Sequence, residues 1–493
     1  MPQKSLSSQL YQAVDRNDIA SINALLSSDN DIKRLLFYKN KKARNTFPLH
    51  LAAEKGQIES LEALLVHKAS KPCIKDMLLA PAQYGYIPLH LAARWGKREA
   101  LQALLTAGTA QSCVKEMLLA PAQNRHTPLH VAVYYGQSEA LQALLTTGRA
   151  QSCVKEMLLE GLEKGRATPL HEAARWDKRE ALQALLTAGT AQSCVKDMLL
   201  APAQYGYTPL HQAAHYGKSE ALQALLSHEA SKSFIKDMLL APAQYGYTPL
   251  DIAAFKSQIE AIKALFEHKA SEPFIQDMLL TPAQHGYTPL HLAARWGQSE
   301  VIKGLLSHEA LKFFIKDMLL VQLEKFGLPL HVAARCGQSE ALQALLTAGT
   351  AQNCLQEMLL AQDGDDKTPL SIAQYQHQHR PSDTTQEILS ILSQQVVAPA
   401  IKEEVISNLV NAFVEHHSTP PISDSVAANS RKRAADTALE VQRKAQRMCT
   451  DAASDKPVSS AALQPNTLSP VDQYLKEAFC QIKDELGGQL SIG

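Results

Sequence analysis

The stretch "TPLHQAAHYGKSEALQALLSHEASKSFIKDMLLAPAQYGY", residues 208–247, predicts a compact helical unit. Pro209 suits the first turn of a helix, where its missing N–H would have no partner in any case. Leu210, Ala213 and Ala214 form a narrow apolar stripe at helical spacing. Gly217 is the residue type that ends a helix in a left-handed conformation. These residues therefore predict a short first helix with an abrupt end.

Two further helices follow in the same stretch. A second helix is predicted to open near Glu220, because a carboxylate favours the positive end of the helix dipole. Its buried face is made by Leu222, Leu225 and Leu226. A third apolar stripe, which predicts a short third helix, consists of Phe234, Ile235, Met238, Leu239 and Leu240. A turn with Pro and Gly then leads into the next unit.

This unit recurs along the chain with a nearly constant period. Its prolines are spaced by 40 residues, with one spacing of 41, at Pro48, Pro88, Pro128, Pro169, Pro209, Pro249, Pro289, Pro329 and Pro369. A degenerate tenth unit precedes them, because residues 12–26 align with residues 51–65. Self-similarity at a fixed period of this length is typical of a solenoid of stacked units.

The repeated motif "TPLHLAA", followed two residues later by glycine and then by a double leucine, resembles the ankyrin repeat. The resemblance implies an all-α, ankyrin-type helical solenoid. The usual ankyrin period is shorter by seven residues, and we expect the added residues to form two turns of a third helix in each repeat. A HEAT or armadillo solenoid has a similar period, but neither would explain "TPLHLAA".

The sequence predicts four regions. Residues 1–45 are expected to be a degenerate N-terminal capping repeat, and residues 46–395 about nine repeats. Residues 396–417 are amphipathic and predict a C-terminal capping helix. Residues 418–493 are predicted to be a largely disordered, flexible tail, because residues 418–470 are rich in Ser, Pro, Ala and Asp. The tail contains a basic segment at 431–447 and a predicted terminal amphipathic helix at 471–486.

The composition favours a soluble protein of a cytosol-like compartment. The chain has 49 basic and 49 acidic residues, so no global charge attracts nucleic acid or anionic membrane. No secretory signal and no stretch of roughly 18 apolar residues that could span a bilayer is evident. Cysteines recur at one repeat position, Cys73, Cys113, Cys153, Cys194 and Cys354, and phenylalanine replaces them in three repeats. This alternation indicates buried apolar thiols and not disulfides or metal ligands.

We find no motif that predicts catalysis or a cofactor. The pairs of cysteines and the HExxH pattern typical of zinc sites are absent from the sequence. A short "GKS" at 217–219 lacks the first glycine of a phosphate-binding loop. The resemblance to ankyrin repeats implies a structural role for the motif histidines, which would bond backbone between adjacent repeats: His50, His90, His130, His171, His211, His291 and His331. We therefore expect no enzyme activity, no cofactor and no metal.

All three tryptophans of the chain occupy one repeat position, the seventh residue after the proline. This position and the preceding one supply the candidate partner-binding residues Arg94, Trp95, Tyr134, Tyr135, Arg175, Trp176, His215, Tyr216, Arg295, Trp296 and Arg335. The resemblance places both positions on the concave side of the solenoid. Trp, Tyr and Arg are enriched at interface hot spots. From Trp95 to Trp296 such a ladder would run about 50 Å, at roughly 10 Å per repeat. The alternative is that the rings stack on neighbouring hairpins and rigidify the array.

The leading hypothesis is a monomeric, non-enzymatic scaffold that binds a partner protein on this face. The near-identical repeats, the long period and the tail look similar to the ankyrin-repeat effectors that intracellular bacterial pathogens inject into host cells. Two alternatives remain: binding of single-stranded RNA on the Arg and aromatic face, and an unrecognised enzyme activity in the tail. Arg431, Lys432, Arg443 and Lys444 resemble a bipartite nuclear import signal, and the alternative is a solvated basic helix. We expect a cytoplasmic location, or delivery into the cytosol or nucleus of a host cell.

Overall fold

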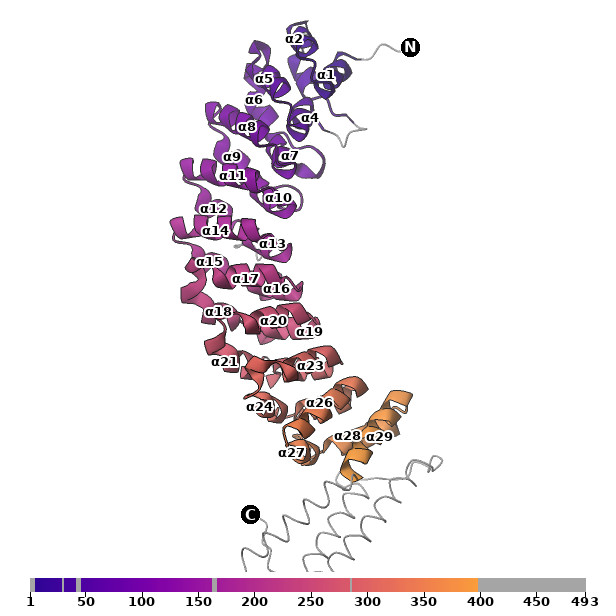
Figure 1. Ribbon diagram of the computed structural model, residues 1–493. Coiled ribbons are helices and arrows are strands. Elements are labelled where there is room, and N and C mark those ends of the chain that lie inside the picture. Colours follow the sequence, from indigo (N-terminus) through magenta and orange to yellow (C-terminus); the bar gives the residue numbers. More distant parts are fainter. Residues whose placement is uncertain (1–4, 29–30, 41–45, 162–165, 284–285, 398–493) are drawn as a thin grey trace, which may run out of the picture. The chain divides into compact units, whose positions relative to one another are not determined.

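The computed structural model describes residues 5–28, 31–40, 46–161, 166–283 and 286–397 (Figure 1). Within these residues, β-structure is limited to two isolated bridges, Asn40–Thr46 and Leu323–Gly327, and the regular structure is otherwise helical. The chain divides into two compact units, residues 1–292 with 307–312, and residues 293–306 with the chain from 313 onward. The all-α prediction is confirmed.

Each repeat begins with a short helix, which starts at the motif proline in every repeat except the first, where α1 starts at Leu6. The preceding residue lies in an extended conformation, as at Thr208 (φ −80°, ψ 168°), and caps the helix. These first helices are α1 (Leu6–Asp15), α4 (Pro48–Lys55), α7 (Pro88–Arg94), α10 (Pro128–Tyr135), α13 (Pro169–Arg175), α16 (Pro209–His215), α19 (Pro249–Phe255), α22 (Pro289–Arg295), α25 (Pro329–Cys336) and α28 (Pro369–His379).

A second helix follows in each unit, and a third helix completes every unit except the last one that the structure describes. The second helices are α2 (Ile19–Ser28), α5 (Ile58–Val66), α8 (Arg98–Ala110), α11 (Ser138–Ala150), α14 (Arg179–Ala191), α17 (Ser219–Ser227), α20 (Ile259–Glu267), α23 (Ser299–Ser307), α26 (Ser339–Ala351) and α29 (Asp383–Val397). The third helices are α3 (Ile32–Leu36), α6 (Ile74–Leu79), α9 (Val114–Leu119), α12 (Val154–Leu159), α15 (Val195–Leu199), α18 (Ile235–Leu239), α21 (Ile275–Leu280), α24 (Ile315–Leu320) and α27 (Leu355–Leu360).

The third helix is shorter than expected. It has five or six residues, about one and a half turns at 3.6 residues per turn, and not two turns. In four repeats the second helix is instead lengthened to 13 residues, in α8, α11, α14 and α26. The residues beyond the usual ankyrin period are thus shared between two helices.

Glycine and histidine decide between the long and the short second helix. Gly108 near the end of α8 packs so closely that an added Cβ would lie 2.5 Å from Met117 Sδ. Where His228 follows the shorter α17, its Nδ1 accepts a hydrogen bond from Ala230 N at 3.2 Å, and a 3₁₀ turn (Glu229–Phe234) begins. Gly108 lets the end of the long second helix pack closely against Met117 of the third helix. In repeats with the short second helix, the histidine caps a 3₁₀ turn that stands in place of the last turn of the long helix.

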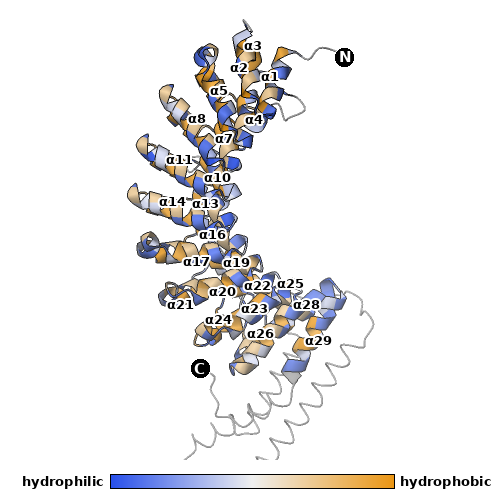
Figure 2. Ribbon diagram, turned by 45° about the horizontal axis from the view of Figure 1, so that its top comes forward, coloured by the Kyte–Doolittle hydropathy of each residue, from blue (hydrophilic) through white to orange (hydrophobic). Residues whose placement is uncertain are grey.

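The core of the first unit lies between stacked helices. The first helices α4, α7, α10, α13, α16 and α19 each pack against the next, and the second helices from α5 to α20 do the same. Alanines such as Ala92 and Ala93, both 0% exposed, let the helices approach closely. Figure 2 shows these helices with hydrophobic and hydrophilic sides, as expected of elements that bury one side against neighbours.

The second unit has its own packing. In it, α25 packs against α26 and α28, and α29 packs against α26 and α28. Ile388 and Leu392 of α29 are buried, at 1% and 0% exposure. The predicted capping helix at 396–417 lies, except for its first two residues, outside the described residues.

The repeated cysteines are buried and unbonded. Cys113, Cys153, Cys194 and Cys354 each place the thiol within 3.8–3.9 Å of a methionine sulfur one helical turn later in the chain. Burial raises the pKa of these four thiols, which disfavours the reactive thiolate. The expectation that they act as apolar fillers is confirmed for these residues.

Candidate functional site

The sixth and seventh residues after each motif proline, at the end of the first helix, form two columns along the repeats. In α7 these are Arg94 and Trp95, and the helix ends because Gly96 takes a left-handed conformation at φ 61°. An added Cβ on Gly96 would lie 2.2 Å from the side-chain oxygen of Gln137, so the turn is also tightly packed against the next repeat. The fixed helix end places the Arg and Trp side chains at the same point in each repeat.

Arg94 bridges two repeats by stacking on aromatic rings. Its Cζ lies 5.3 Å from the ring centroid of Trp95 and 4.9 Å from that of Tyr135 in the next repeat. Arg175 does the same two repeats further on, at 5.3 Å from Trp176 and 4.8 Å from Tyr216. All four distances from a guanidinium carbon to a ring centroid lie within the range of a cation–π interaction.

Tyr134 connects the two arginine clusters. Its ring contacts Tyr135 of its own helix and Trp176 of the next repeat edge-on, with centroids 4.9 Å apart in both pairs. His215 extends the series beyond Arg175 by contacting Tyr216 at 4.6 Å. We call this set the Arg–aromatic surface: Arg94, Trp95, Tyr134, Tyr135, Arg175, Trp176, His215 and Tyr216. The structure therefore brings eight of the candidate residues together within the first unit.

The rings of this surface remain accessible although they are held by neighbours. Trp95 is 47% exposed, and Trp176, Tyr134, Tyr135 and Tyr216 are between 36% and 39% exposed. Among the described residues, Arg94 and Arg175 have no carboxylate within 4.0 Å, and the Nε of each is buried without a hydrogen-bond partner. Rigid, exposed rings that alternate with uncompensated guanidinium groups are chemically suited to contact a second molecule.

The remaining candidates belong to the second unit. Arg295 lies over the ring of Trp296, with Cζ 5.8 Å from the centroid, and Trp296 is 51% exposed. Arg335 is held differently, because it forms an ion pair with the buried carboxylate of Asp363 and stacks on Phe326 at 5.7 Å. Its charge is therefore already compensated within the protein.

Glu172 was not among the candidate residues identified from the sequence. Its buried carboxylate holds Trp176 of the Arg–aromatic surface in place. Glu172 is only 4% exposed, and its Oε2 accepts a hydrogen bond from Trp176 Nε1 at 3.0 Å. Most other repeats carry Leu, Val or Ile at this position. A carboxylate in a mostly apolar column was the available signal, and its hydrogen bond orients the indole of Trp176.

Tyrosines at the turns before the prolines divide into two classes. Tyr86 stacks on His90 with ring centroids 5.1 Å apart, and Tyr207 stacks on His211 at 5.6 Å, so both reinforce the repeat structure. Tyr84, Tyr205 and Tyr245 are instead 57–59% exposed and adopt positive φ values of 62–64°. Bulky side chains rarely occupy this backbone region.

The motif histidines link adjacent repeats, as the ankyrin resemblance implies. His211 Nδ1 accepts a hydrogen bond from the backbone N–H of Thr208, so Nε2 carries the proton and donates to the carbonyl of Tyr247. Burial lowers the pKa of His50, His90, His171 and His211 to about 4 and of His130 to about 3. These imidazoles are neutral at pH 7 and lie inside the protein. Their arrangement is that of structural linkers.

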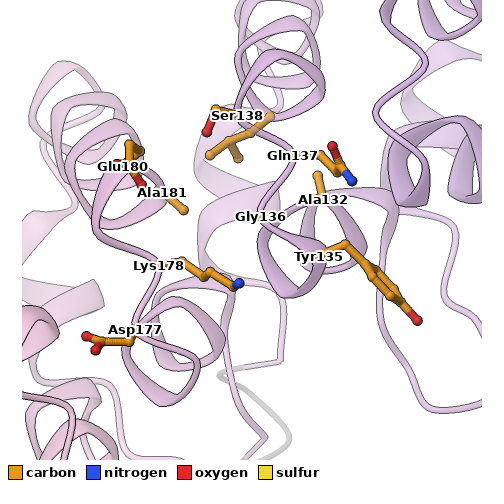
Figure 3. Close-up of a pocket in the computed structure, with 10 residues that line it drawn as sticks. Ala132, Tyr135, Gly136, Gln137, Ser138, Asp177, Lys178, Glu180 and Ala181 are labelled. Carbon is orange, nitrogen blue, oxygen red and sulfur yellow. The ribbon is translucent and has the colours of Figure 1, made fainter.

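A small surface pocket adjoins the Arg–aromatic surface. It has a volume of about 270 Å³ and lies between the turns that follow α10 and α13 (Figure 3). Figure 3 shows Lys178 extending toward Gly136, while the ring of Tyr135 points away from the other lining side chains. Ligand pockets usually measure about 300–1,000 Å³. The volume is below that range, so we place the candidate site on the Arg–aromatic surface.

Several sequence predictions lie outside the described residues. These are the nuclear import candidates Arg431, Lys432, Arg443 and Lys444, the tail at 418–493 and its terminal helix. Within the part of the chain that the structure describes, no helix is both long and apolar enough to cross a membrane.

Comparison with known families gives one match. A family model described as ankyrin repeats (3 copies) matches residues 10–112, 107–197, 190–277 and 245–317. No curated protein matches the chain.

Proposed function

Because the chain belongs to the ankyrin-repeat family, whose members typically are non-enzymatic protein–protein interaction scaffolds, we propose that it binds a partner protein through the Arg–aromatic surface. The observation that carries this proposal is a continuous series of contacts, which runs in order through Trp95, Arg94, Tyr135, Tyr134, Trp176, Arg175 and Tyr216. It gathers the residue types that dominate binding energy at interfaces.

The geometry of the surface supports binding of a macromolecule. Its rings are immobilised by cation–π contacts before any partner arrives, so little side-chain entropy is lost on binding. It crosses four repeats, and at about 8–10 Å per helix packing step it extends for roughly 25–30 Å. A protein surface or an extended peptide matches this length, whereas a metabolite would touch only part of it.

Trp296 and Arg295 form a second, smaller candidate contact in the other unit. We propose that they contribute separately to partner binding, because their cation–π pair repeats the arrangement at Trp95. Arg335 is the weakest candidate of the original set, since Asp363 already neutralises it.

RNA binding is the second candidate function, and one observation favours it. The Arg–aromatic surface contains stacked arginines and exposed rings, which also occur in sites for single strands. Against it, one face of four of the rings is covered by the protein's own guanidinium groups. An enzyme activity would have to reside in the tail, outside the described residues.

The decisive experiment is capture of partners from a eukaryotic lysate by the full chain, followed by mass spectrometry. Trp95→Ala combined with Trp176→Ala should abolish capture of a specific protein while leaving the helical circular dichroism nearly unchanged. Arg98→Ala is the matched control, because Arg98 is exposed on α8 and outside the Arg–aromatic surface. Partners that bind the double variant as well as the unmodified chain would refute the proposal.

We also propose that the protein is an effector that acts inside a host cell. The near-identity of the repeats, their long period and the appended tail support this proposal. A translocation reporter fused to the full chain in an intracellular bacterium should give a host-cell signal that depends on the secretion system. An equal signal from a secretion-deficient strain would contradict it.

Entry into the nucleus of that cell is a separate proposal. Residues 418–493 fused to a fluorescent protein too large for passive diffusion should accumulate in the nucleus. Alanine at Arg431, Lys432, Arg443 and Lys444 should return the fluorescence to the cytosol. Cytosolic fluorescence of the unchanged fusion would exclude nuclear import by the tail.

A further inference from the structure

The two columns that form the Arg–aromatic surface carry positive charge only. In the repeats from α7 to α19, their charged residues are Arg94, Arg175 and Lys256, and no acidic residue occupies either column. Lys256 lies over the ring of Phe255, with Nζ 4.8 Å from the centroid. None of the three cations has a carboxylate within 4.0 Å among the residues that the structure describes. In these repeats the two columns therefore carry no negative charge of their own, and the buried carboxylate of Glu172 next to them already accepts a hydrogen bond from Trp176 Nε1.

The two arginines are also held in a way that selects a particular anion. Each guanidinium carbon lies within 5.3 Å of two ring centroids and each Nε is buried, so the terminal N–H groups are the part of the guanidinium left for a ligand. A carboxylate binds these groups through two parallel hydrogen bonds in the guanidinium plane. Nucleic-acid bases would need open ring faces for stacking, which these contacts reduce.

The spacing of the arginines constrains the ligand further. Arg94 and Arg175 end α7 and α13, which are two repeat steps apart, about 16–20 Å at 8–10 Å per step. An extended peptide advances about 3.3 Å per residue, so five or six residues cover this distance. Side chains of an extended strand point to the same side only at even separations. A separation of six residues satisfies both conditions.

We propose that the partner of the Arg–aromatic surface is an extended acidic segment with two carboxylates six residues apart, one on Arg94 and one on Arg175. The side chains between them lie over Tyr134, Tyr135 and Trp176, which favours apolar residues at the intervening even positions. This inference rests on the proposed function and specifies the chemistry of its partner.

Selection of a random 16-residue phage-displayed peptide library on the full chain tests the proposal. Selected peptides should be enriched in Asp or Glu pairs at i and i+6, and a synthetic copy should bind in fluorescence polarisation. Moving one carboxylate to i+5 should weaken binding by about tenfold or more, because that side chain then points away from the surface.

Variants of the protein assign each carboxylate to its arginine. Arg94→Ala and Arg175→Ala should each weaken binding of the synthetic peptide by about tenfold, and Lys178→Ala, outside the surface, should not. Removing the matching carboxylate in the Arg94→Ala background should cause no further loss, which is the sign of a direct pair. If Arg94→Ala and removal of the matching carboxylate weakened binding additively, the pairing of that carboxylate with Arg94 would be wrong.

The outcomes separate this inference from the proposed function. Peptides that lose binding in the Trp95→Ala and Trp176→Ala variant but carry no acidic pair would overturn the acidic partner and leave the surface as a protein-binding site. Tighter binding of a single-stranded oligouridylate than of any selected peptide, with a steep salt dependence, would overturn both. A library that yields no binder dependent on this surface would also count against both.

Discussion

The Nε2 of His211 lies 2.9 Å from the carbonyl oxygen of Tyr247, 36 residues later in the chain, and this contact joins two successive repeats. The same contact recurs with equal sequence separation from His50 to Tyr86 and from His90 to His126. The rings of His90 and His211 donate from Nε2 and accept at Nδ1, so each must be neutral to make both bonds. The repeat interface therefore depends on the protonation state of one residue type.

The first prediction concerns pH. Five buried histidines keep a pKa of about 3 to 4, whereas the unfolded chain protonates them near 6.5. Below pH 6.5 the unfolded state binds more protons, so stability is complete above this value and falls as the pH drops toward 4. Each histidine adds up to about 1.4 kcal/mol per pH unit to this fall. Urea unfolding followed by circular dichroism between pH 7.5 and 4.5 measures it.

The control for this prediction is His211→Gln, which removes one titrating ring from the interface. Its urea midpoint should depend less steeply on pH than that of the unmodified protein. Midpoints that stay constant from pH 7 to 4.5 would show that the buried histidines are not what links stability to pH.

The second prediction concerns Asp251, which replaces the motif histidine in α19. Burial raises its pKa to about 7, and its Oδ1 is buried without a hydrogen-bond partner. The protonated carboxyl of Asp251 contributes fully to the free energy of unfolding below pH 3.8, the ordinary pKa of the group in the unfolded chain. This contribution is lost as the pH rises through the folded-state pKa of about 7. Asp251→Asn, which cannot ionise, should therefore stabilise the protein at pH 8 by about 2–4 kcal/mol and far less at pH 5. Thermal midpoints that differ from the unmodified protein by the same amount at both pH values would contradict this.

The third prediction uses two helical glycines with opposite surroundings. A Cβ on Gly108 would meet Met117 Sδ at 2.5 Å, so Gly108→Ala should destabilise by about 1–3 kcal/mol. Gly304 in α23 has no atom within 4 Å of an added Cβ, so Gly304→Ala should stabilise by about 1 kcal/mol. Chemical denaturation of the two variants measures both effects, and equal signs would contradict the packing described.

The fourth prediction concerns residues that replace glycine at the turn between the first two helices. Ser257 has φ 58°, and its side chain makes no hydrogen bond to the described residues, so Ser257→Gly should stabilise by about 1 kcal/mol. Asp177 has φ 56°, but its Oδ1 accepts a hydrogen bond from Ala221 N at 2.7 Å. Asp177→Gly should therefore give little or no gain in the thermal midpoint. A larger gain at Asp177 than at Ser257 would refute the argument.

The sequence by itself determined the repeat architecture. Pro209 and Gly217 predict where a helix starts and ends, because both depend on local backbone chemistry, whereas the linking role of His211 followed from the resemblance to ankyrin repeats. The period of 40 residues then repeats that local solution along the chain. The positions of the arginines and tryptophans at the helix ends followed from the same pattern.

Only the tertiary structure decided how those side chains meet. Arg94 stacks on Tyr135, 41 residues away in the chain, whereas Arg335 pairs with Asp363 and is neutralised. The position of both arginines in their repeats is the same, so the repeat pattern alone could not distinguish them. The close packing of Gly108 against Met117, nine residues later, likewise became evident only in the structure. Contacts between distant residues depend on three-dimensional packing, which a local sequence pattern does not encode.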